Sequence, residues 1–244
     1  MNELLPMLNK FKEMPGAISV TEAIALYQTI QNHLITNSQG RSEYFIDFGS
    51  HAGKSSLIAI TALSSINKTG MFLLIDPAFD PNSVQRKTTL AFAPDDYLNT
   101  IKENVCSFNE RRSSIMPILH GLTSEQFVNN HVPLPISYAF IDSGEHSKES
   151  IKIETDYLKN HTLPGSLIIF HDVGNQFTAT TYALRELVDS EKFEEIKIDW
   201  EPIFAFVDTY RLEIGNNSWH WLNHPHPNFI GVIRRKGIEN VAKE

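Results

Sequence analysis

The sequence lacks several features that would assign a protein to a special class. Its 244 residues include one cysteine, Cys106, so no disulfide can form within the chain. No apolar run approaches the roughly 20 residues of a membrane-spanning helix, and the N-terminal segment lacks the basic and apolar regions of a signal peptide. Repeats and low-complexity segments are absent as well. These absences favour a cytoplasmic globular protein with no membrane partner.

Long runs of basic residues are also missing. The chain has 21 Lys and Arg against 29 Asp and Glu, and its formal net charge is −8 at pH 7. Proteins bind nucleic acids mainly through arrays of Lys and Arg, so we expect no nucleic-acid partner. Hydrophobic residues make up 41% of the chain, which is enough for a sizeable core. The length suits one large domain or two small ones, and we interpret residues 1–244 as a single domain.

What the chain does contain is an alternation of strand-like and helical segments. We expect strands at 43–49, 71–76, 114–121, 137–142, 166–172, 193–200 and 229–235, and helices at 18–35, 54–66, 94–108, 148–161 and 176–190. Ser19 followed by Glu22 indicates a capping box at the start of the first of these helices. Strands that alternate with helices favour a parallel sheet covered on both faces. The last two strands have no predicted helix between them, which favours an antiparallel C-terminal hairpin. The predicted fold class is therefore α/β, a Rossmann-like, doubly wound, seven-stranded sheet that is mostly parallel.

Polar residues gather where the predicted strands end. The strand ends carry Asp47, Asp76, His120, Gly121, Asp142, His171 and Asp172. Aspartate is common in turns, so one such residue would carry little information. Ligands of parallel sheets bind outside the carboxyl ends of the strands. Four aspartates and two histidines at that edge therefore predict a polar site.

The segment DFGSHAGKSS, Asp47 to Ser56, is the most suggestive loop. A P-loop requires four residues between its first glycine and its Gly-Lys-Ser, whereas Gly49 and Gly53 enclose three. This spacing argues against a P-loop kinase or nucleotide hydrolase. The G-x-G-x-x-G pattern of dinucleotide-binding folds is also absent.

Asp47, Gly49 and Gly53 resemble the first motif of class I S-adenosylmethionine-dependent methyltransferases, acid-x-Gly-x-x-x-Gly. The resemblance implies that Asp47 orients the amino-acid part of the cofactor and that Lys54 has no phosphate to bind. Asp76, 23 residues after Gly53, would bind the ribose hydroxyls. The implied cofactor site comprises Asp47, Gly49, Ser50, His51, Gly53, Ser55, Asp76, Gly121, Ser124 and Asp142. Ser124 is alternatively a helix N-cap, and His51 an ordinary loop side chain.

The segment FIDSGEHSKESIKIETDYLKNHTLPGSLIIFHDV, residues 140–173, is similar to a narrower methyltransferase subfamily. Macrocin O-methyltransferase-like and cephalosporin-hydroxylase-like proteins have F-I-D-G-D-H-S, a helix, P-G-G and a strand ending in H-D. Here three residues separate Asp142 from His146, where the subfamily has two, and Ser166 replaces a glycine. Related catechol O-methyltransferase-type enzymes hold a metal at the same two strand ends.

Methyl transfer to oxygen gives these residues a chemical purpose, because a neutral hydroxyl is a poor nucleophile without a base or a metal. We expect Asp142 and Asp172 to be ligands for Mg²⁺, which prefers oxygen. His171 as a third ligand favours Mn²⁺, Fe²⁺ or Zn²⁺, and alternatively acts as a base or hydrogen-bond donor. His146 is the candidate general base, with a capping or surface role as the alternative. The expected catalytic set is Asp142, His146 and His171.

Two terminal segments lie outside this motif pattern. Residues 200–228, between the last two strands, contain all three tryptophans and form an aromatic-rich insertion. They are interpreted either as an acceptor pocket or as an oligomer or core contact. A metal cluster of His220, His224 and His226 is disfavoured because it lacks a carboxylate or cysteine partner. Residues 1–40 form an N-terminal helical extension, which covers the cofactor side or mediates a dimer contact.

Together these observations predict an S-adenosylmethionine-dependent methyltransferase. It would methylate a hydroxyl of a small-molecule acceptor with the help of Mg²⁺ or another divalent metal. The alternative is a non-catalytic or differently catalytic adenosine-cofactor-binding protein with the same fold. A homo-oligomeric state is left open.

Overall fold

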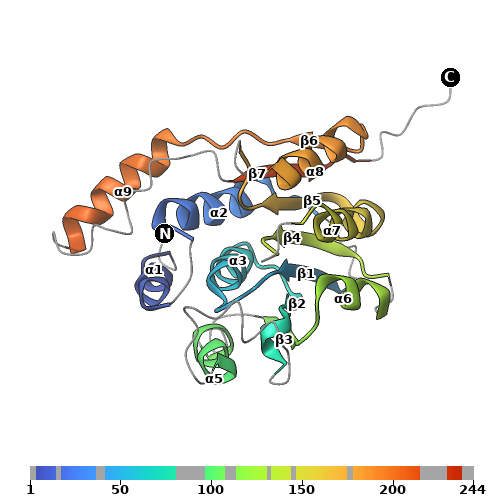
Figure 1. The fold of residues 1–244 in the computed structure, drawn as a ribbon. Coiled ribbons are helices and arrows are strands. Elements are labelled where there is room, and N and C mark those ends of the chain that lie inside the picture. Colours follow the sequence, from blue (N-terminus) through green and yellow to red (C-terminus); the bar gives the residue numbers. More distant parts are fainter. Residues whose placement is uncertain are drawn as a thin grey trace.

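The computed structural model of the chain describes residues 4–14, 18–36, 42–80, 97–107, 114–130, 133–143, 147–174, 178–214 and 230–237. These residues form a seven-stranded sheet with helices on both faces (Figure 1). The strands are β1 Glu43–Phe48, β2 Gly70–Ile75, β3 Ile115–His120, β4 Ile136–Ile141, β5 Thr162–Phe170, β6 Phe193–Glu195 and β7 Gly231–Arg235. The helices are α1 Leu4–Glu13, α2 Val20–His33, α3 Lys54–Ser65, α5 Tyr97–Ile101, α6 Ser124–Asn130, α7 Lys148–His161, α8 Thr178–Asp189 and α9 Glu201–Ile214, with a 3₁₀ turn η1 Pro77–Phe79 and a π-helix η2 Lys102–Ser107.

The sheet has the order β3-β2-β1-β4-β5-β7-β6. Strands β1 to β5 are parallel, and β7 pairs antiparallel with both β5 and β6. This arrangement confirms the predicted doubly wound, mostly parallel α/β fold. The chain order reverses between β1 and β4, and ligands of such sheets bind beside the carboxyl ends of the strands at that point.

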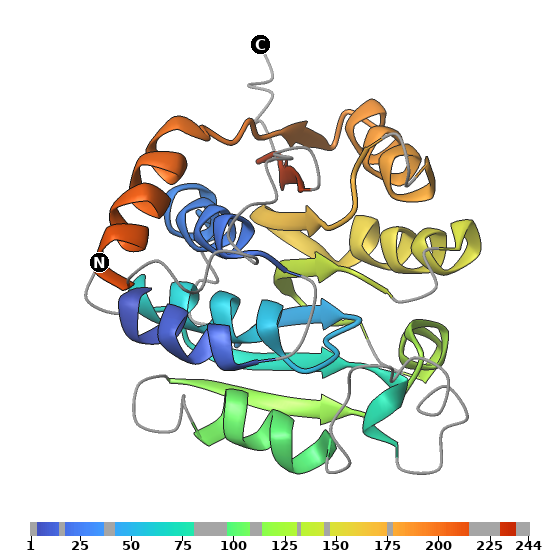
Figure 2. The same cartoon turned by 60° about the vertical axis from the view of Figure 1, so that its left-hand side comes forward.

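Two layers of apolar side chains bury the two faces of the sheet. Alternate residues such as Phe45 and Tyr138 join one cluster with α1, α2 and α3, whereas Ile46 and Ile141 join another with α6, α7 and α8. Figure 2 shows these helices on either side of the strands. The period of two along each strand follows from the pleat of the backbone. The same alternation indicates on which face of the sheet a side chain near a strand end lies.

Helix α2 begins with the capping box that the sequence predicts. The Ser19 hydroxyl accepts a hydrogen bond from the Glu22 N–H at 3.2 Å, and the Ser19 N–H donates to Glu22 Oε2 at 2.7 Å. The helix contacts α3, β5 and α9 and is buried along most of its length. It therefore belongs to the same core as the sheet.

Several elements differ from the predicted ones, including an additional helix, α6, between β3 and β4. A helix, α9, lies between β6 and β7, so the expectation of two strands without an intervening helix is wrong. Buried Ile203 and Val207, four residues apart, give α9 the apolar stripe that packs it on the core. Strand β6 ends at Glu195, earlier than predicted. Strand β5 begins at Thr162, earlier than the predicted start at residue 166, and its pairing with β4 is irregular there.

No helix in the described ranges has both the length and the apolar character needed to cross a membrane.

Candidate active site

The loop after β1 is built from left-handed backbone conformations. Gly49, His51 and Gly53 have φ angles of 82°, 44° and 85°. The Gly53 N–H donates to the Ser50 carbonyl at 2.7 Å and closes the turn that leads into α3. A Cβ atom at Gly49 would lie 2.0 Å from the Asp142 carbonyl oxygen, so only glycine allows this close approach. The predicted cofactor loop therefore touches the end of β4.

Asp47 lies beneath this loop and is wholly buried. Its Oδ2 atom accepts a hydrogen bond from Ser55 Oγ at 2.6 Å and another from Ser56 Oγ. Burial raises the pKa of Asp47 to about 7, and these hydrogen bonds oppose the rise. The carboxyl group thus ties β1 to the first turn of α3. That Asp47 orients the amino-acid part of the cofactor stays a prediction. In this geometry Asp47 would do so indirectly, by holding the loop in place.

Asp76, after β2, holds the same loop from the neighbouring strand. Its Oδ2 atom accepts a hydrogen bond from the His51 N–H, and its Oδ1 atom accepts one from the Ala78 N–H, both at 2.8 Å. Burial raises the pKa of Asp76, while the two N–H groups lower it. Burial lowers the pKa of His51, and the negative charge of Asp76 opposes this. The ribose contact of Asp76 and the role of the His51 ring stay predictions.

The residues after β3 make structural contacts. A Cβ atom at Gly121 would lie 2.7 Å from the Asp80 backbone nitrogen, so the turns after β2 and β3 touch. Thr123 is the capping residue of α6, because it exchanges hydrogen bonds of 3.0 and 3.2 Å with Gln126. The alternative assignment of Ser124 as N-cap is therefore wrong. The Ser124 hydroxyl donates to Glu154 of α7, and its adenine contact stays a prediction.

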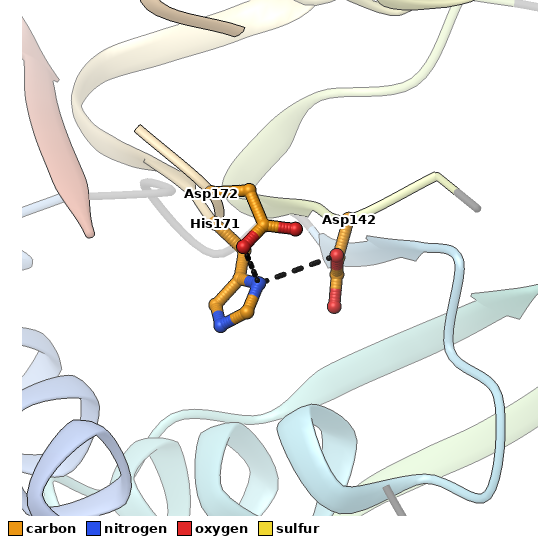
Figure 3. A group of neighbouring side chains, drawn as sticks. All are labelled: Asp142, His171 and Asp172. Atoms are coloured by element: carbon orange, nitrogen blue, oxygen red, sulfur yellow. Dashed lines mark ion pairs between the residues drawn. The ribbon is translucent and has the colours of Figure 1, made fainter. Parts of the chain in front are cut away.

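Three predicted metal ligands meet at the ends of β4 and β5 (Figure 3). His171 Nδ1 lies 3.4 Å from Asp142 Oδ1 and 3.3 Å from Asp172 Oδ1. One candidate ligand atom from each residue lies within 4.8 Å of the others. Strand alternation would send consecutive side chains to opposite faces. Asp172 has a φ of 56°, a left-handed conformation that allows its carboxylate to approach His171.

His171 is the centre of this cluster. Its side chain is buried, and neither ring nitrogen has a hydrogen-bond partner among the described residues. Nε2 lies 3.5 Å from Glu22 Oε1, a contact that reaches across to α2. Burial lowers the pKa of His171, but the charge of Asp142 and the side-chain contacts with Asp142, Asp172 and Glu22 raise it well above its usual value. Three carboxylates therefore converge on one imidazole.

The donor set fits a divalent cation. The separations of 3.3 and 3.4 Å at Nδ1 exceed the usual N–H···O distance of about 2.7–3.2 Å. They suit two atoms that are each about 2.0–2.2 Å from one shared ion. A buried nitrogen without a hydrogen bond, beside two carboxylate oxygens, is a mixed nitrogen and oxygen site. Such a set suits Mn²⁺, Fe²⁺ or Zn²⁺ better than an all-oxygen site would.

Glu22 is the site residue that the sequence prediction missed. The motif around Ser19 explained Glu22 fully as a capping residue, so nothing suggested a second contact. The available signal was that Glu22 is the single acidic side chain of helix α2. His120 is not part of the cluster, since its ring packs at 5.4 Å on Phe127 of α6.

Several predicted residues are not placed in the site. His146 lies outside the described residues, and so do His220, His224 and His226. Of the aromatic residues in 200–228, Trp200 and Phe206 pack against the core. The Trp200 ring also stacks on the Phe204 ring, with 6.1 Å between the ring centroids. For these residues the structure favours the core contact over an acceptor pocket.

The sheet order and the polar edge beside the β1 loop agree with the fold of a class I S-adenosylmethionine-dependent methyltransferase. Residues 46–173, just over half of the chain, match the family described as a methyltransferase domain, and the chain belongs to this family. No curated protein matches the chain in sequence.

Several solved structures are similar to the chain. The O-methyltransferase NovP has a TM-score of 0.55 and 9% identity, over 89% of this chain and 81% of NovP. The calicheamicin methyltransferase CalS11 has a TM-score of 0.49 and 13% identity, over 87% and 76%. The N-methyltransferase NodS from Bradyrhizobium japonicum WM9, solved with S-adenosyl-L-homocysteine, has a TM-score of 0.46 and 10% identity, over 97% and 100%. At such low sequence identities the similarity concerns the fold alone. Of these three structures, NovP is the one whose TM-score supports a shared fold.

Proposed function

We propose that this methyltransferase methylates a hydroxyl oxygen of a small-molecule acceptor with the help of a divalent metal. One observation carries the proposal: Asp142, His171 and Asp172 converge at the edge of the sheet where the glycine loop ends. The contact between Gly49 and the Asp142 backbone makes the two regions neighbours. Such closeness is what transfer between a bound donor and a bound acceptor requires.

Each part of the chain has a defined task in this proposal. The loop from Gly49 to Gly53 and the carboxylate of Asp76 bind the methyl donor. Asp142, His171 and Asp172 would hold the metal. When bound, the metal would act as a Lewis acid that lowers the pKa of the acceptor hydroxyl. His146 remains the proposed general base.

The competing function is a protein that binds an adenosine cofactor without transferring a methyl group. A scaffold of that kind has no need for a buried histidine that faces three carboxylates, because burying charged groups is costly. The cluster therefore favours catalysis. A cytoplasmic location remains a prediction from the sequence.

Calorimetry with three cofactors and one metal tests the proposal. We expect S-adenosylmethionine to bind and ATP and NAD not to bind. Asp172→Ala should weaken Mn²⁺ binding at least about tenfold, because it removes a ligand, and should change S-adenosylmethionine affinity by less than about twofold. Asp156→Ala, on the exposed surface of α7, is the matched control and should bind both normally.

Two results would contradict the proposal in different ways. If ATP binds and S-adenosylmethionine does not, the cofactor assignment is wrong. If Asp172→Ala binds Mn²⁺ as the unmodified protein does, the metal assignment is wrong and the cofactor assignment still stands.

A further inference from the structure

We propose that Glu22 is a positioning residue that orients His171 and keeps its Nδ1 atom available to the metal. The inference rests on the proposed metal site and adds a residue from the N-terminal helix α2 to it. Glu22 lies far from Asp142 and His171 in the sequence, and the predicted methyltransferase motifs do not include it.

The two nitrogens of His171 face different partners. Nδ1 lies near Asp142 and Asp172, at 3.4 and 3.3 Å, whereas Nε2 lies 3.5 Å from Glu22 Oε1. A histidine bound to a metal is a neutral imidazole that carries its proton on the other nitrogen. A carboxylate beside Nε2 favours the proton there, which leaves the lone pair on Nδ1. Metal-binding histidines commonly have such a carboxylate partner, which fixes the ring and raises its basicity.

Glu22 is itself held in place by the start of its helix. Its Oε2 atom accepts the Ser19 N–H at 2.7 Å, within the capping box. The other oxygen, Oε1, is the atom nearest His171. One carboxylate therefore serves two partners through separate oxygens. The capping box gives Glu22 a fixed orientation, so His171 meets a partner that is already positioned.

The charges of the cluster support a cation on the Nδ1 side. Glu22, Asp142 and Asp172 surround a single imidazole. The Lys54 cation interacts with the charge of Glu22, and burial makes the negative charge that remains at Asp142 and Asp172 costly. A divalent cation between Asp142, Asp172 and His171 would offset most of that charge. Glu22 would then remain on the far side of the ring, 3.5 Å from Nε2, where its negative charge favours the proton on that nitrogen.

Glu22→Gln separates the helix-capping role of Glu22 from its contact with His171. A glutamine keeps a carbonyl oxygen for the Ser19 N–H, so the capping box persists. Its amide group then turns toward Nε2 and donates, which forces Nε2 to accept and moves the imidazole proton to Nδ1. We expect Mn²⁺ affinity, measured by calorimetry, to fall about 10- to 100-fold. The melting temperature should change by less than about 2 °C.

Ser19→Ala is the matched control, because it weakens the helix cap without removing the Glu22 carboxylate. The Ser19 backbone N–H that binds Oε2 is also retained. We expect its melting temperature to fall by about 2–4 °C, as the loss of a helix cap predicts for a chain of this size. Its Mn²⁺ affinity should stay within about twofold of the unmodified protein.

Each outcome decides between the claims. The inference is overturned if Glu22→Gln binds Mn²⁺ normally, or if Ser19→Ala loses as much affinity as Glu22→Gln. If the unmodified protein binds no Mn²⁺, the metal site and this inference both fail. Loss of affinity in Glu22→Gln alone, with its melting temperature preserved, supports the inference.

Discussion

At the scale of single residues, Asp47 shows how burial changes an acid. The carboxyl group is enclosed by the β1 loop and by Ser55 and Ser56 of α3. Enclosure disfavours the charged form, and the negative charges of Asp142 and Asp76 add to the effect. The result is a pKa of about 7, close to neutral pH. Asp47 therefore links the pH of the solution to the stability of the cofactor loop.

This link predicts how stability depends on pH. The pKa of Asp47 is about 7 in the folded chain and 3.8 as a reference value, so the folded state holds the extra proton between these values. Stability should therefore fall as pH rises from about 4 to about 7, by up to about 4 kcal/mol from this group, and level off above that. Asp47→Asn should remove this part of the pH dependence. Urea unfolding of both proteins at pH 5, 6, 7 and 8 measures it.

The comparison uses the change of stability with pH, so any constant cost of the asparagine cancels. Asp156→Asn, at an exposed position on α7, should keep the pH dependence of the unmodified protein. Equal pH dependence in Asp47→Asn and the unmodified protein would contradict the buried, proton-binding role of Asp47.

Residues at the strand ends were predictable in part. Strand alternation puts His171 on the face of Ile169, and Asp142 on the face of Phe140, so sequence reasoning can bring these two together. The position of Asp172 could not be obtained this way. The left-handed backbone conformation of Asp172 turns its side chain toward His171, opposite to the direction that strand alternation predicts. Aspartate tolerates this conformation but does not require it, so the sequence alone does not indicate it.

At the scale of elements, Lys54 is the first residue of α3. It follows a glycine, as the lysine of a P-loop does, but its contacts are structural. Lys54 Nζ lies 4.4 Å from the Phe11 ring centroid in α1 and 3.5 Å from the Ile18 carbonyl oxygen before α2. Burial lowers the pKa of Lys54 to about 8, and the charge of Glu22 opposes this. Lys54 thus stabilises the packing of the N-terminal segment on α3 through these contacts with Phe11 and Ile18.

Lys54→Ala should therefore affect stability and leave nucleotide binding unchanged. The cation–π contact and the packed side chain are worth about 1 kcal/mol together, so we expect the melting temperature to fall by about 2–4 °C. Lys152→Ala, on the exposed face of α7, should lower it by less than about 1 °C. Calorimetry with ATP should give no binding before or after the change. ATP binding that disappears with Lys54 would instead support a P-loop.

The predictable elements are those with strong local signals. Helix α7 occupies 148–161 as predicted, and Ser19 and Glu22 form the predicted capping box. Helix α9 was missed because the aromatic residues of 200–228 were interpreted as an acceptor pocket or as an oligomer or core contact, without a helical pattern. The contact between Glu22 and His171 was missed for another reason. It joins residues that are distant in sequence, and only the packing of α2 on β5 brings them together.

At the scale of the whole molecule, the order of the strands makes the site. Strand β1 lies beside β4, so the glycine loop meets Asp142, and β4 lies beside β5, so Asp142 meets His171 and Asp172. The alternation of strands and helices predicts such an edge, and the methyltransferase resemblance implies this order. The closure of the site by α2 depends on long-range packing and carries no local signal.

The central claim is that a divalent metal binds at this edge beside the methyl donor. A crystal structure of the protein with S-adenosylhomocysteine and Mn²⁺, with anomalous diffraction data, tests it most directly. We predict a manganese peak at about 2.0–2.3 Å from His171 Nδ1 and from carboxylate oxygens of Asp142 and Asp172. The adenosine ligand should lie along the loop from Gly49 to Gly53, with its ribose at Asp76. A structure with the ligand in that place and no manganese at the three residues would contradict the account.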